Sequence, residues 1–321
     1  MTLDGWPAPE RIAEAEKWMR HAAAAHGRPL AGVIERIHMR PWSTVCRAPT
    51  ATSALILKVC HAVQAFEPAL TEIVAREQPG LTPELIARHP TEPWMILVDG
   101  GMRLRDALSG SAWIDAWTRL LPRYAELQRA LVGREADLRS AGVPDRRLDR
   151  LASLLGQILA DERAAPIDVR RRLRDLLPRI ERGCADLAAY GIGASLDHAD
   201  LHDNNVLERD GRLTIIDWGD AGVTHPFLSW FVTLRFAERA GGDAAELRRL
   251  RDAYFEPWTS DLHRRDLERA ADLGAALGTI PGVLTWYGIT REIDGVQARD
   301  PGEMAVALDQ VSASIEGLPV T

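Results

Sequence analysis

Residues 195–220 read SLDHADLHDNNVLERDGRLTIIDWGD, and this stretch decides the fold. Two apolar runs flank the polar segment around Asp210-Gly211, and this pattern predicts a tight β-hairpin. A hairpin returns the chain to the point where it began. Asp217, at the end of the stretch, is therefore expected to lie beside Asp200 and Asn205 at its start.

These three side chains supply the groups that phosphoryl transfer from a nucleoside triphosphate needs. The reaction requires a carboxylate near the attacking hydroxyl and oxygen ligands for a Mg²⁺ ion that bridges the phosphates. Asp200, Asn205 and Asp217 are oxygen-bearing side chains of this kind. Because aspartate and asparagine also favour ordinary turns, the set alone could be loop chemistry, and the rest of the chain must decide.

Upstream, the pattern is typical of a small β-rich unit. Strand composition is found at residues 33–39, 44–47, 54–59 and 94–98, and residues 67–78 read as a helix. The first three strands follow one another closely, which predicts an antiparallel meander. Lys58 lies in the third strand and is one of only two lysines among 39 basic residues. Because this chain uses arginine at almost every other basic position, a retained lysine is a candidate for a position where arginine would not fit.

Beyond Gly101 the pattern is almost wholly helical, apart from the hairpin. Amphipathic stretches fall at residues 113–138, 146–162, 169–189, 244–255, 264–277 and 301–316, and a further one at residues 7–25 precedes the strands. We therefore predict an α+β fold of two lobes. The N-lobe would span residues 1–98, a hinge residues 99–102, and a larger helical C-lobe residues 103–321.

The pattern His198-x-Asp200-x-x-x-x-Asn205, followed after the hairpin by Asp217, resembles the catalytic loop and magnesium motif of the aminoglycoside phosphotransferase family. Members of that family share the protein-kinase-like fold, and the resemblance covers most of the chain. It implies that Asp200 is the catalytic base and that His198 holds the loop. It also implies that Asn205 and Asp217 bind Mg²⁺.

For the N-lobe, the resemblance implies a nucleotide site. Lys58 would hold the α- and β-phosphates of ATP or GTP and pair with a helix glutamate. Glu67 is the first choice because it opens the helix after the lysine strand, and Glu72 is the alternative. The hinge backbone at Val98, Asp99 and Gly100 would meet the nucleotide base.

Two features depart from the family pattern. Between His198 and Asp200 the family usually has glycine, whereas this chain has Ala199. That difference matters if the position needs a positive φ. Residues 40–44 stand where a kinase has its glycine-rich loop, and they contain no glycine; Ser43 in this turn could bind a phosphate.

Several further residues are candidates for smaller roles. His202 is either a substrate-side residue or a polar loop residue. Asp220 is either a third acidic ligand or, as we favour, a helix cap. In the C-terminal helices, where the family builds its acceptor site, the acidic and aromatic candidates are Trp258, Asp261, Trp286, Tyr287, Glu292 and Asp294.

Composition excludes some other classes of protein. A formal net charge of −7 disfavours a nucleic-acid binder, and no apolar run reaches the roughly 20 residues of a membrane span. The first eleven residues do not have the pattern of a secretory signal. The three cysteines show neither a metal-ligand spacing nor a disulfide framework, which favours a cytoplasmic location.

The expected activity is therefore a Mg²⁺-dependent transfer of phosphate from ATP or GTP to a hydroxyl of a small molecule by a monomer or weak dimer. The acceptor is left open: a cationic compound, choline, an amino sugar and homoserine are candidates besides an aminoglycoside. A nucleotide-binding pseudokinase or regulatory protein is the alternative of another class. A protein kinase is disfavoured because no Ala-Pro-Glu sequence follows Asp217.

Overall fold

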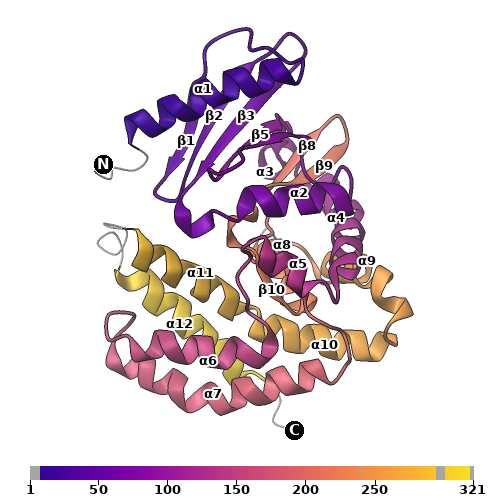
Figure 1. Cartoon of the computed structure of the whole chain (residues 1–321). Helices are drawn as coiled ribbons and strands as arrows, with labels where there is room; N and C mark the ends of the chain where they lie inside the picture. Colours follow the sequence, from indigo (N-terminus) through magenta and orange to yellow (C-terminus); the bar gives the residue numbers. More distant parts are fainter. Residues whose placement is uncertain (1–7, 240, 294–300, 319–321) are drawn as a thin grey trace.

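A computed structural model describes residues 8–239, 241–293 and 301–318 of the chain. Its N-terminal part is a five-stranded antiparallel sheet with the strand order β1-β2-β3-β5-β4 (Figure 1). The strands are β1 (Glu35–Arg40), β2 (Ser43–Pro49), β3 (Ala54–Cys60), β4 (Leu85–Arg88) and β5 (Trp94–Val98). The predicted meander is the β1-β2-β3 part of this sheet, and each neighbouring pair is antiparallel.

Helices α1 (Pro9–Ala25) and α2 (Glu67–Glu77) lie on opposite faces of the sheet (Figure 1). Successive side chains of a strand point to opposite faces, and β3 uses both. Leu55, Leu57 and Val59 belong to the apolar cluster that includes the buried face of α1. Ile56 and Lys58 face the other way, into a cleft. Alternation along β3 therefore places the lysine in the cleft.

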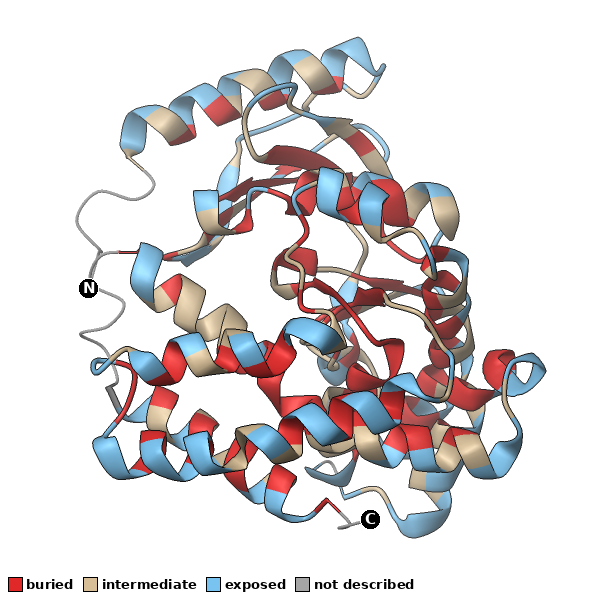
Figure 2. Ribbon diagram, turned by 60° about the horizontal axis from the view of Figure 1, so that its bottom comes forward, coloured by how far each residue is buried: buried red, intermediate tan, exposed pale blue. Residues whose placement is uncertain are grey.

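The rest of the chain is mainly helical and surrounds two small sheets. Its helices are α3 (Leu104–Ala107), α4 (Gly110–Leu131), α5 (Glu135–Ser140), α6 (Leu148–Ala160), α7 (Ile167–Ala188), α8 (Trp230–Arg239), α9 (Ala244–Phe255), α10 (Arg264–Leu277), α11 (Thr279–Glu292) and α12 (Pro301–Glu316). Its strands are β6 (Met102–Arg103), β7 (Ser195–Asp197), β8 (Val206–Arg209), β9 (Arg212–Ile215) and β10 (Gly222–Thr224). Figure 2 shows buried residues along the inner faces of these helices.

The predicted α+β class is confirmed, and so is the hairpin, which β8 and β9 form around Asp210 (φ 52°) and Gly211 (φ 79°). The sheet ends at Val98 and β6 begins at Met102. The assignment of residues 99–102 as a hinge between two lobes remains a prediction.

Three helix assignments differ from the sequence pattern. The single helix predicted at residues 113–138 is divided into α4 and α5, because Gly133 between them adopts φ 78°. Helices α8 and α11 were not among the predicted ranges. Pro281 lies in the first turn of α11, where proline is tolerated because no intrahelical donor is lost.

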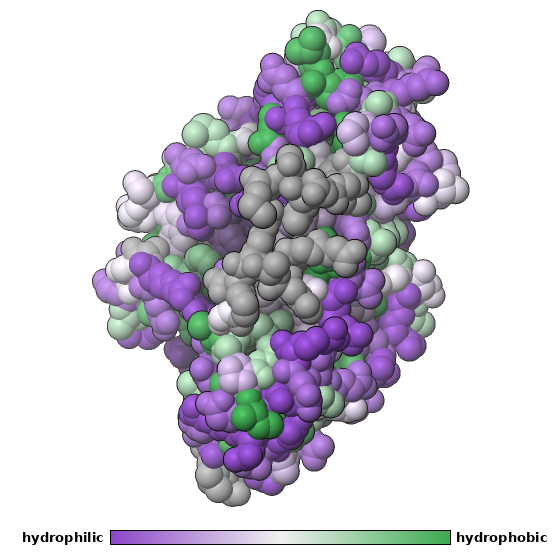
Figure 3. All heavy atoms as spheres, turned by 90° about the vertical axis from the view of Figure 1, so that its left-hand side faces the viewer, coloured by the Kyte–Doolittle hydropathy of each residue, from purple (hydrophilic) through white to green (hydrophobic). Residues whose placement is uncertain are grey.

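No helix in the described ranges is long and apolar enough to cross a membrane. Around the residues drawn in grey, the face seen in Figure 3 is largely hydrophilic, with apolar residues in small separate groups. All three cysteines are buried and form no disulfide.

Candidate active site

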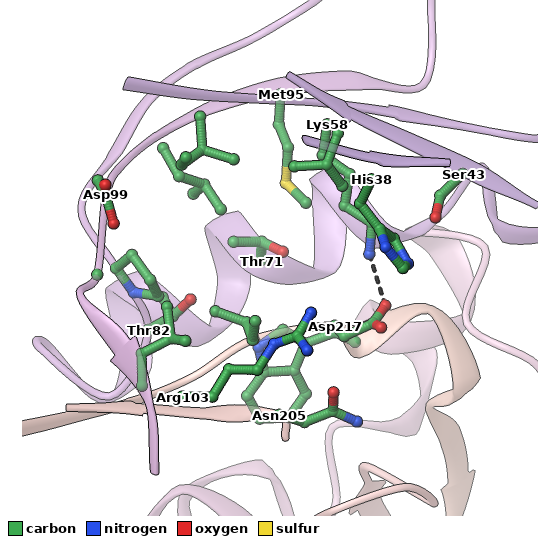
Figure 4. Close-up of a pocket in the computed structure, with 18 of the residues that line it drawn as sticks. His38, Ser43, Lys58, Thr71, Thr82, Met95, Asp99, Arg103, Asn205 and Asp217 are labelled. Atoms are coloured by element: carbon green, nitrogen blue, oxygen red, sulfur yellow. Dashed lines mark hydrogen bonds and ion pairs between the residues drawn. The ribbon is translucent and has the colours of Figure 1, made fainter. Parts of the chain in front are cut away.

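Lys58 is the centre of a buried ion-pair cluster. Its Nζ lies 2.6 Å from Oε1 of Glu67 and 2.6 Å from Oδ1 of Asp217. The exposed fraction of the side chain is 9% for Lys58 and 0% for Glu67. Figure 4 shows Lys58 reaching Asp217 across the cleft. The cluster thus joins β3 and α2, which are close in the sequence, to the end of the β8–β9 hairpin, which lies 159 residues beyond Lys58.

Opposite charges govern the protonation of this cluster. Burial alone would lower the pKa of Lys58, but the carboxylates of Asp217 and Glu67 outweigh it and raise that pKa. For Asp217, burial favours the neutral acid, yet the charge of Lys58 prevails and holds the pKa of the carboxyl below its usual value. Lys58 and Asp217 are therefore charged at neutral pH.

Glu67, and not Glu72, is the partner of Lys58. Glu67 opens α2, and its Oε1 also accepts a hydrogen bond from the backbone N–H of Trp218 at 3.1 Å. Glu72 lies one and a half turns further along the helix and pairs with Arg88 at 3.2 Å on the surface. A position at the start of α2 therefore suits the ion pair.

The catalytic-loop residues predicted from the sequence lie together. The side-chain N–H of Asn205 donates to the backbone carbonyl and to Oδ2 of Asp200, both at 2.9 Å. The buried His198 donates from Nε2 to the carbonyl of Ile216 at 3.0 Å, because a carbonyl can only accept. That bond joins the loop to the segment leading into Asp217. The side chain of Asp200 is 40% exposed and hence accessible to a substrate.

His202 contacts Asp200 directly, which the sequence did not indicate. Its Nε2 lies 3.3 Å from Oδ2 of Asp200, and its ring stacks on Phe236 with centroids 4.5 Å apart. Burial lowers the pKa of His202, but hydrogen bonds to Asp200 and Asp203 outweigh burial and raise it to about 9. A positive charge thus adjoins Asp200 at neutral pH.

Ala199 adopts a left-handed conformation with φ 62°. Its backbone N–H donates to Oδ1 of the buried Asp197 at 2.8 Å, which helps to hold this conformation. A left-handed L-residue costs about 1–2 kcal/mol. The position therefore does require a positive φ, and this chain bears a strain that glycine would not.

Replacing Ala199 with glycine should remove part of this strain. We expect Ala199→Gly to raise the free energy of unfolding by about 1 kcal/mol through the relief of strain. Part of this gain is offset, because glycine gives the unfolded chain more conformational freedom. The gain corresponds to about 2 °C in Tm for a protein of this size. Thermal unfolding followed by circular dichroism measures it, and an unchanged or lower Tm would contradict the strain.

A buried polar network supports the loop from behind, and sequence reasoning missed it. The side chain of Gln128 donates to the carbonyl of Leu196 at 2.9 Å and accepts from the Tyr254 hydroxyl at 2.7 Å. The Tyr124 hydroxyl lies 2.6 Å from Oγ of Ser229, which donates in turn to Asp197. No local motif marks these residues, because each lies in an ordinary amphipathic or loop segment.

A cleft of about 490 Å³ lies between the five-stranded sheet and the catalytic loop. Lys58, His38 and Ser43 reach it from the sheet, whereas Asp217, Asn205 and Arg103 lie on the opposite side (Figure 4). The lining combines apolar side chains, namely Ile56, Met95, Leu97, Val98, Leu207 and Ile216, with the basic side chains of His38, Arg40, Arg47, Lys58 and Arg103. This combination suits a ligand with a flat apolar base and an anionic chain.

The predicted hinge residues Val98, Asp99 and Gly100 also line the cleft. The backbone N–H of Val98 donates to Glu84, and that of Asp99 donates to Ala54, both at 2.9 Å. Within the described residues, the N–H of Gly100 has no such partner. A Cβ on Gly100 would lie 2.6 Å from a methyl carbon of Leu207, so a larger residue there would require the Leu207 side chain to shift.

Asn205 and Asp217 offer oxygen atoms to a metal ion on the side of the cleft that holds the catalytic loop. In the described parts of the chain, no group of three or more His, Cys, Asp or Glu side chains could hold a metal by itself. Mg²⁺ is typically bound by one or two carboxylates together with phosphate oxygens and water. The two side chains therefore fit a magnesium ion that arrives with a nucleotide.

Asp220 is not a helix cap, which corrects the favoured interpretation. It ends the short 3-10 helix Trp218–Asp220, and its carboxylate accepts a hydrogen bond from the side chain of Gln64 at 3.1 Å. Burial, together with the charges of Asp200 and Asp217, raises the pKa of Asp220 to about 7. Burial, the larger cause, disfavours the ionised carboxylate, so the Asp220 side chain is partly protonated at neutral pH.

The acceptor-site candidates of the C-terminal helices lie elsewhere. Trp258 is a core residue, Asp261 pairs with Arg129 at 2.9 Å, and the hydroxyl of Tyr287 donates to Asp161. Trp286 packs edge-on against Trp42, and Glu292 is exposed. None of these five lines the cavity that adjoins Asp200. Asp294 falls outside the described residues.

The sheet, the lysine strand, the glutamate helix and the loop-hairpin unit together form a protein-kinase-like fold, of the kind found in small-molecule phosphotransferases. A choline/ethanolamine kinase family protein from Mesorhizobium loti has this fold, with 16% identity, a TM-score of 0.60 and alignment of 95% of this chain to 96% of that one. A macrolide 2'-phosphotransferase from Brachybacterium faecium aligns at 20% identity and a TM-score of 0.55, over 95% and 100% of the two chains.

An aminoglycoside 2'-phosphotransferase solved as its GDP complex aligns at 17% identity and a TM-score of 0.57, over 94% of this chain and 98% of the other. No family model and no curated protein matches the sequence. At these sequence identities, the similarity establishes the fold of this chain alone. The three proteins described above share that fold although their named activities differ.

Proposed function

We propose that this protein is a small-molecule kinase that transfers the γ-phosphoryl group of ATP or GTP to a hydroxyl. The observation that supports this function best is the buried Lys58 cluster, which shares one cleft with Asn205, the hydrogen-bond partner of Asp200. Positioning and charge neutralisation provide most of the catalysis in this class of reaction. An arrangement of this kind is what such catalysis requires.

Asp200 would act as the base. Its exposed carboxylate orients the acceptor hydroxyl and takes up its proton as the new bond between the hydroxyl oxygen and the γ-phosphorus forms. The bond between the γ-phosphorus and the β–γ bridging oxygen breaks, and the nucleoside diphosphate leaves with that electron pair. Asn205 holds Asp200 through its side-chain amide, and His202 contacts the same carboxylate.

Lys58 would neutralise the α- and β-phosphates, with Glu67 holding its ammonium group in place. Asn205 and Asp217 would hold Mg²⁺, which supplies positive charge to the phosphate oxygens when it is bound. Among the residues that the structure describes, the N–H of Gly100 has no backbone partner, which leaves it available to the nucleotide base. Ser43 lines the same cleft near Lys58 (Figure 4) and would bind a phosphate there.

Arg103 should contribute to nucleotide binding. It lines the cleft from β6, opposite Arg40 of β1, and neither arginine makes an ion pair or side-chain hydrogen bond within the described residues. We expect Arg103→Gln to weaken the binding of ADP about 3- to 10-fold, with a smaller loss at high salt because this side chain is exposed.

Titration calorimetry at two salt concentrations measures this effect. Arg171→Gln on α7 is the matched control, because it removes an exposed positive charge outside the cleft. Equal affinities of the wild type and Arg103→Gln at low salt would contradict the role of Arg103.

The decisive experiment for the function is a phosphorylation screen of small alcohols with both nucleotides. Phosphorylated product that requires Mg²⁺ supports the proposal. A pseudokinase would bind ATP with Mg²⁺, seen as a thermal shift, but would transfer no phosphate to any acceptor. Because Asp200, Asn205 and Asp217 are all present, the enzyme is the favoured reading.

A further inference from the structure

The turn between β1 and β2 is a tight hairpin. β1 ends at Arg40 and β2 begins at Ser43, and these two residues already pair across the hairpin. Pro41, one of the two residues between them, has no N–H. A glycine-rich loop binds phosphates through a row of backbone N–H groups. This hairpin instead offers a phosphate mainly its side chains.

The register of the sheet places side chains of β1 on the face that lines the cleft. His38 pairs with Val45, which pairs with Lys58, so the three form one row across β1, β2 and β3. Residues in one row point to the same face of a sheet, and all three line the cleft. Arg40 and Ser43, which we call the turn pair, line it as well. Two strand spacings separate the backbones of His38 and Lys58, about 10 Å in all.

The turn pair lies further from the predicted hinge than Lys58 does. Leu55 of β3 is opposite Val98, at the hinge end of the sheet. Lys58 is three residues further along β3, and Ser43 is opposite Cys60, two residues beyond Lys58. Because a strand rises about 3.3 Å per residue, the turn pair is about 7 Å further from the hinge than Lys58. A nucleotide with its base at the hinge and its α- and β-phosphates at Lys58 would extend its γ-phosphate toward the turn pair.

Basic side chains converge on this part of the cleft. Within the described residues, neither His38 nor Arg40 makes a hydrogen bond or an ion pair. Burial, and then the charges of Arg40 and Arg103, lower the pKa of His38, so both arginines act on its ring. Figure 4 shows His38 reaching into the cleft from the sheet and Arg103 from the opposite side. The potential between Lys58 and the turn therefore favours an anion.

We propose that His38 and Arg40 bind the γ-phosphate of the nucleoside triphosphate and take the place of the backbone donors of a glycine-rich loop. This inference rests on the proposed phosphotransferase function and goes beyond the roles of Lys58 and Arg103, which it places nearer the hinge. His38 and Arg40 form no covalent bond. They hold γ-phosphate oxygens while the phosphorus leaves the bridging oxygen of the nucleotide for the acceptor oxygen. This end of the cleft thus distinguishes a triphosphate from a diphosphate.

The test compares the binding of a diphosphate and a triphosphate to the full chain. The probes are ADP and the non-hydrolysable β,γ-imido-ATP, with their guanine counterparts, and calorimetry in the presence of Mg²⁺ measures both affinities. We expect Arg40→Gln to weaken the binding of the triphosphate analogue about 10-fold and that of ADP less than about 3-fold. His38→Leu should weaken the binding of the analogue about 3- to 10-fold with the same selectivity. Arg40→Lys keeps the charge and should lose less affinity than Arg40→Gln.

Two further variants serve as controls. Arg36→Gln removes an exposed positive charge from the same strand, but Arg36 pairs with Cys46, which packs in the apolar cluster under α1. It should leave both affinities unchanged. Arg103→Gln should weaken the binding of ADP and of the analogue by similar factors, because β6 directly follows the predicted hinge.

The outcomes separate the two proposals. Equal losses of ADP and analogue affinity in Arg40→Gln, or no loss of either, would overturn the inference, and phosphorylated product in the acceptor screen would still support the kinase function. If the loss is selective but no acceptor is phosphorylated, the γ-phosphate site stands and the kinase function fails. If neither nucleotide binds to the wild type, both proposals are overturned. Thermal unfolding of each variant shows that a loss of binding is not a loss of folding.

Discussion

Asp200→Asn is expected to reduce kcat by about 10³-fold, within the 10²- to 10⁴-fold range of a positioned general base. An asparagine side chain keeps the oxygen that accepts from Asn205 at 2.9 Å, so the loop should retain its conformation. It cannot accept the hydroxyl proton. Nucleotide affinity should therefore change little, because the ion-pair cluster around Lys58 does not involve Asp200 directly.

Single-turnover and steady-state rates on an accepted alcohol, with calorimetry for the nucleotide, measure the two effects. Asp210→Asn is the matched control. It makes the same chemical change in the hairpin turn, where asparagine tolerates φ 52°. If Asp200→Asn retained more than about a tenth of the wild-type kcat, Asp200 would not be the general base.

The second large effect is expected from Lys58→Met. Glu67 has no exposed side-chain surface, so the variant leaves a buried carboxylate without its cation. Removing one partner of a buried pair costs about 3–5 kcal/mol of unfolding free energy. Nucleotide affinity should fall as well, because the cleft loses its most deeply placed positive charge.

A double-mutant cycle separates these causes. Adding Glu67→Gln to Lys58→Met removes the isolated charge, and we expect it to restore at least half of the lost stability but none of the nucleotide affinity. Urea unfolding and calorimetry measure the two quantities, with Lys17→Met on the exposed face of α1 as control. A Lys58→Met variant as stable as the wild type would show that the buried pair contributes nothing to stability.

Lys58→Arg is the conservative variant. It keeps the charge but replaces a compact ammonium, held at 2.6 Å by two carboxylates, with a larger planar fork. We expect a smaller loss of stability than in Lys58→Met, together with a clear loss of nucleotide affinity. If the nucleotide affinity were unchanged, the site would not require the smaller ammonium group of a lysine at position 58.

The arrangement at the active site explains why substitutions of Lys58 and of Asp200 are expected to have different effects. Lys58 lies in the sheet and neutralises the carboxylates of Glu67 and Asp217, so its loss should disturb folding as well as binding. Asp200 is 40% exposed on a loop held by His198 and Asn205, so its loss should disturb chemistry alone. Comparing stability with turnover in both variants therefore tests the proposed division of roles.

The sequence by itself determined the parts that depend on local pattern. The hairpin followed from Asp210-Gly211 between apolar runs, and the place of Lys58 in the third strand followed from the strand composition of residues 54–59. The order of strands and helices then indicated the α+β class. These features rest on interactions between residues that are near in the chain, which a linear pattern can record.

Tertiary structure alone decided the rest. It selected Glu67 over Glu72, placed His202 against Asp200, and put Asp220 beside Gln64 instead of at a helix end. Each of these depends on which helix faces cross at one point in space, and side chains contributed singly by distant segments leave no periodic or short-range signal in the sequence.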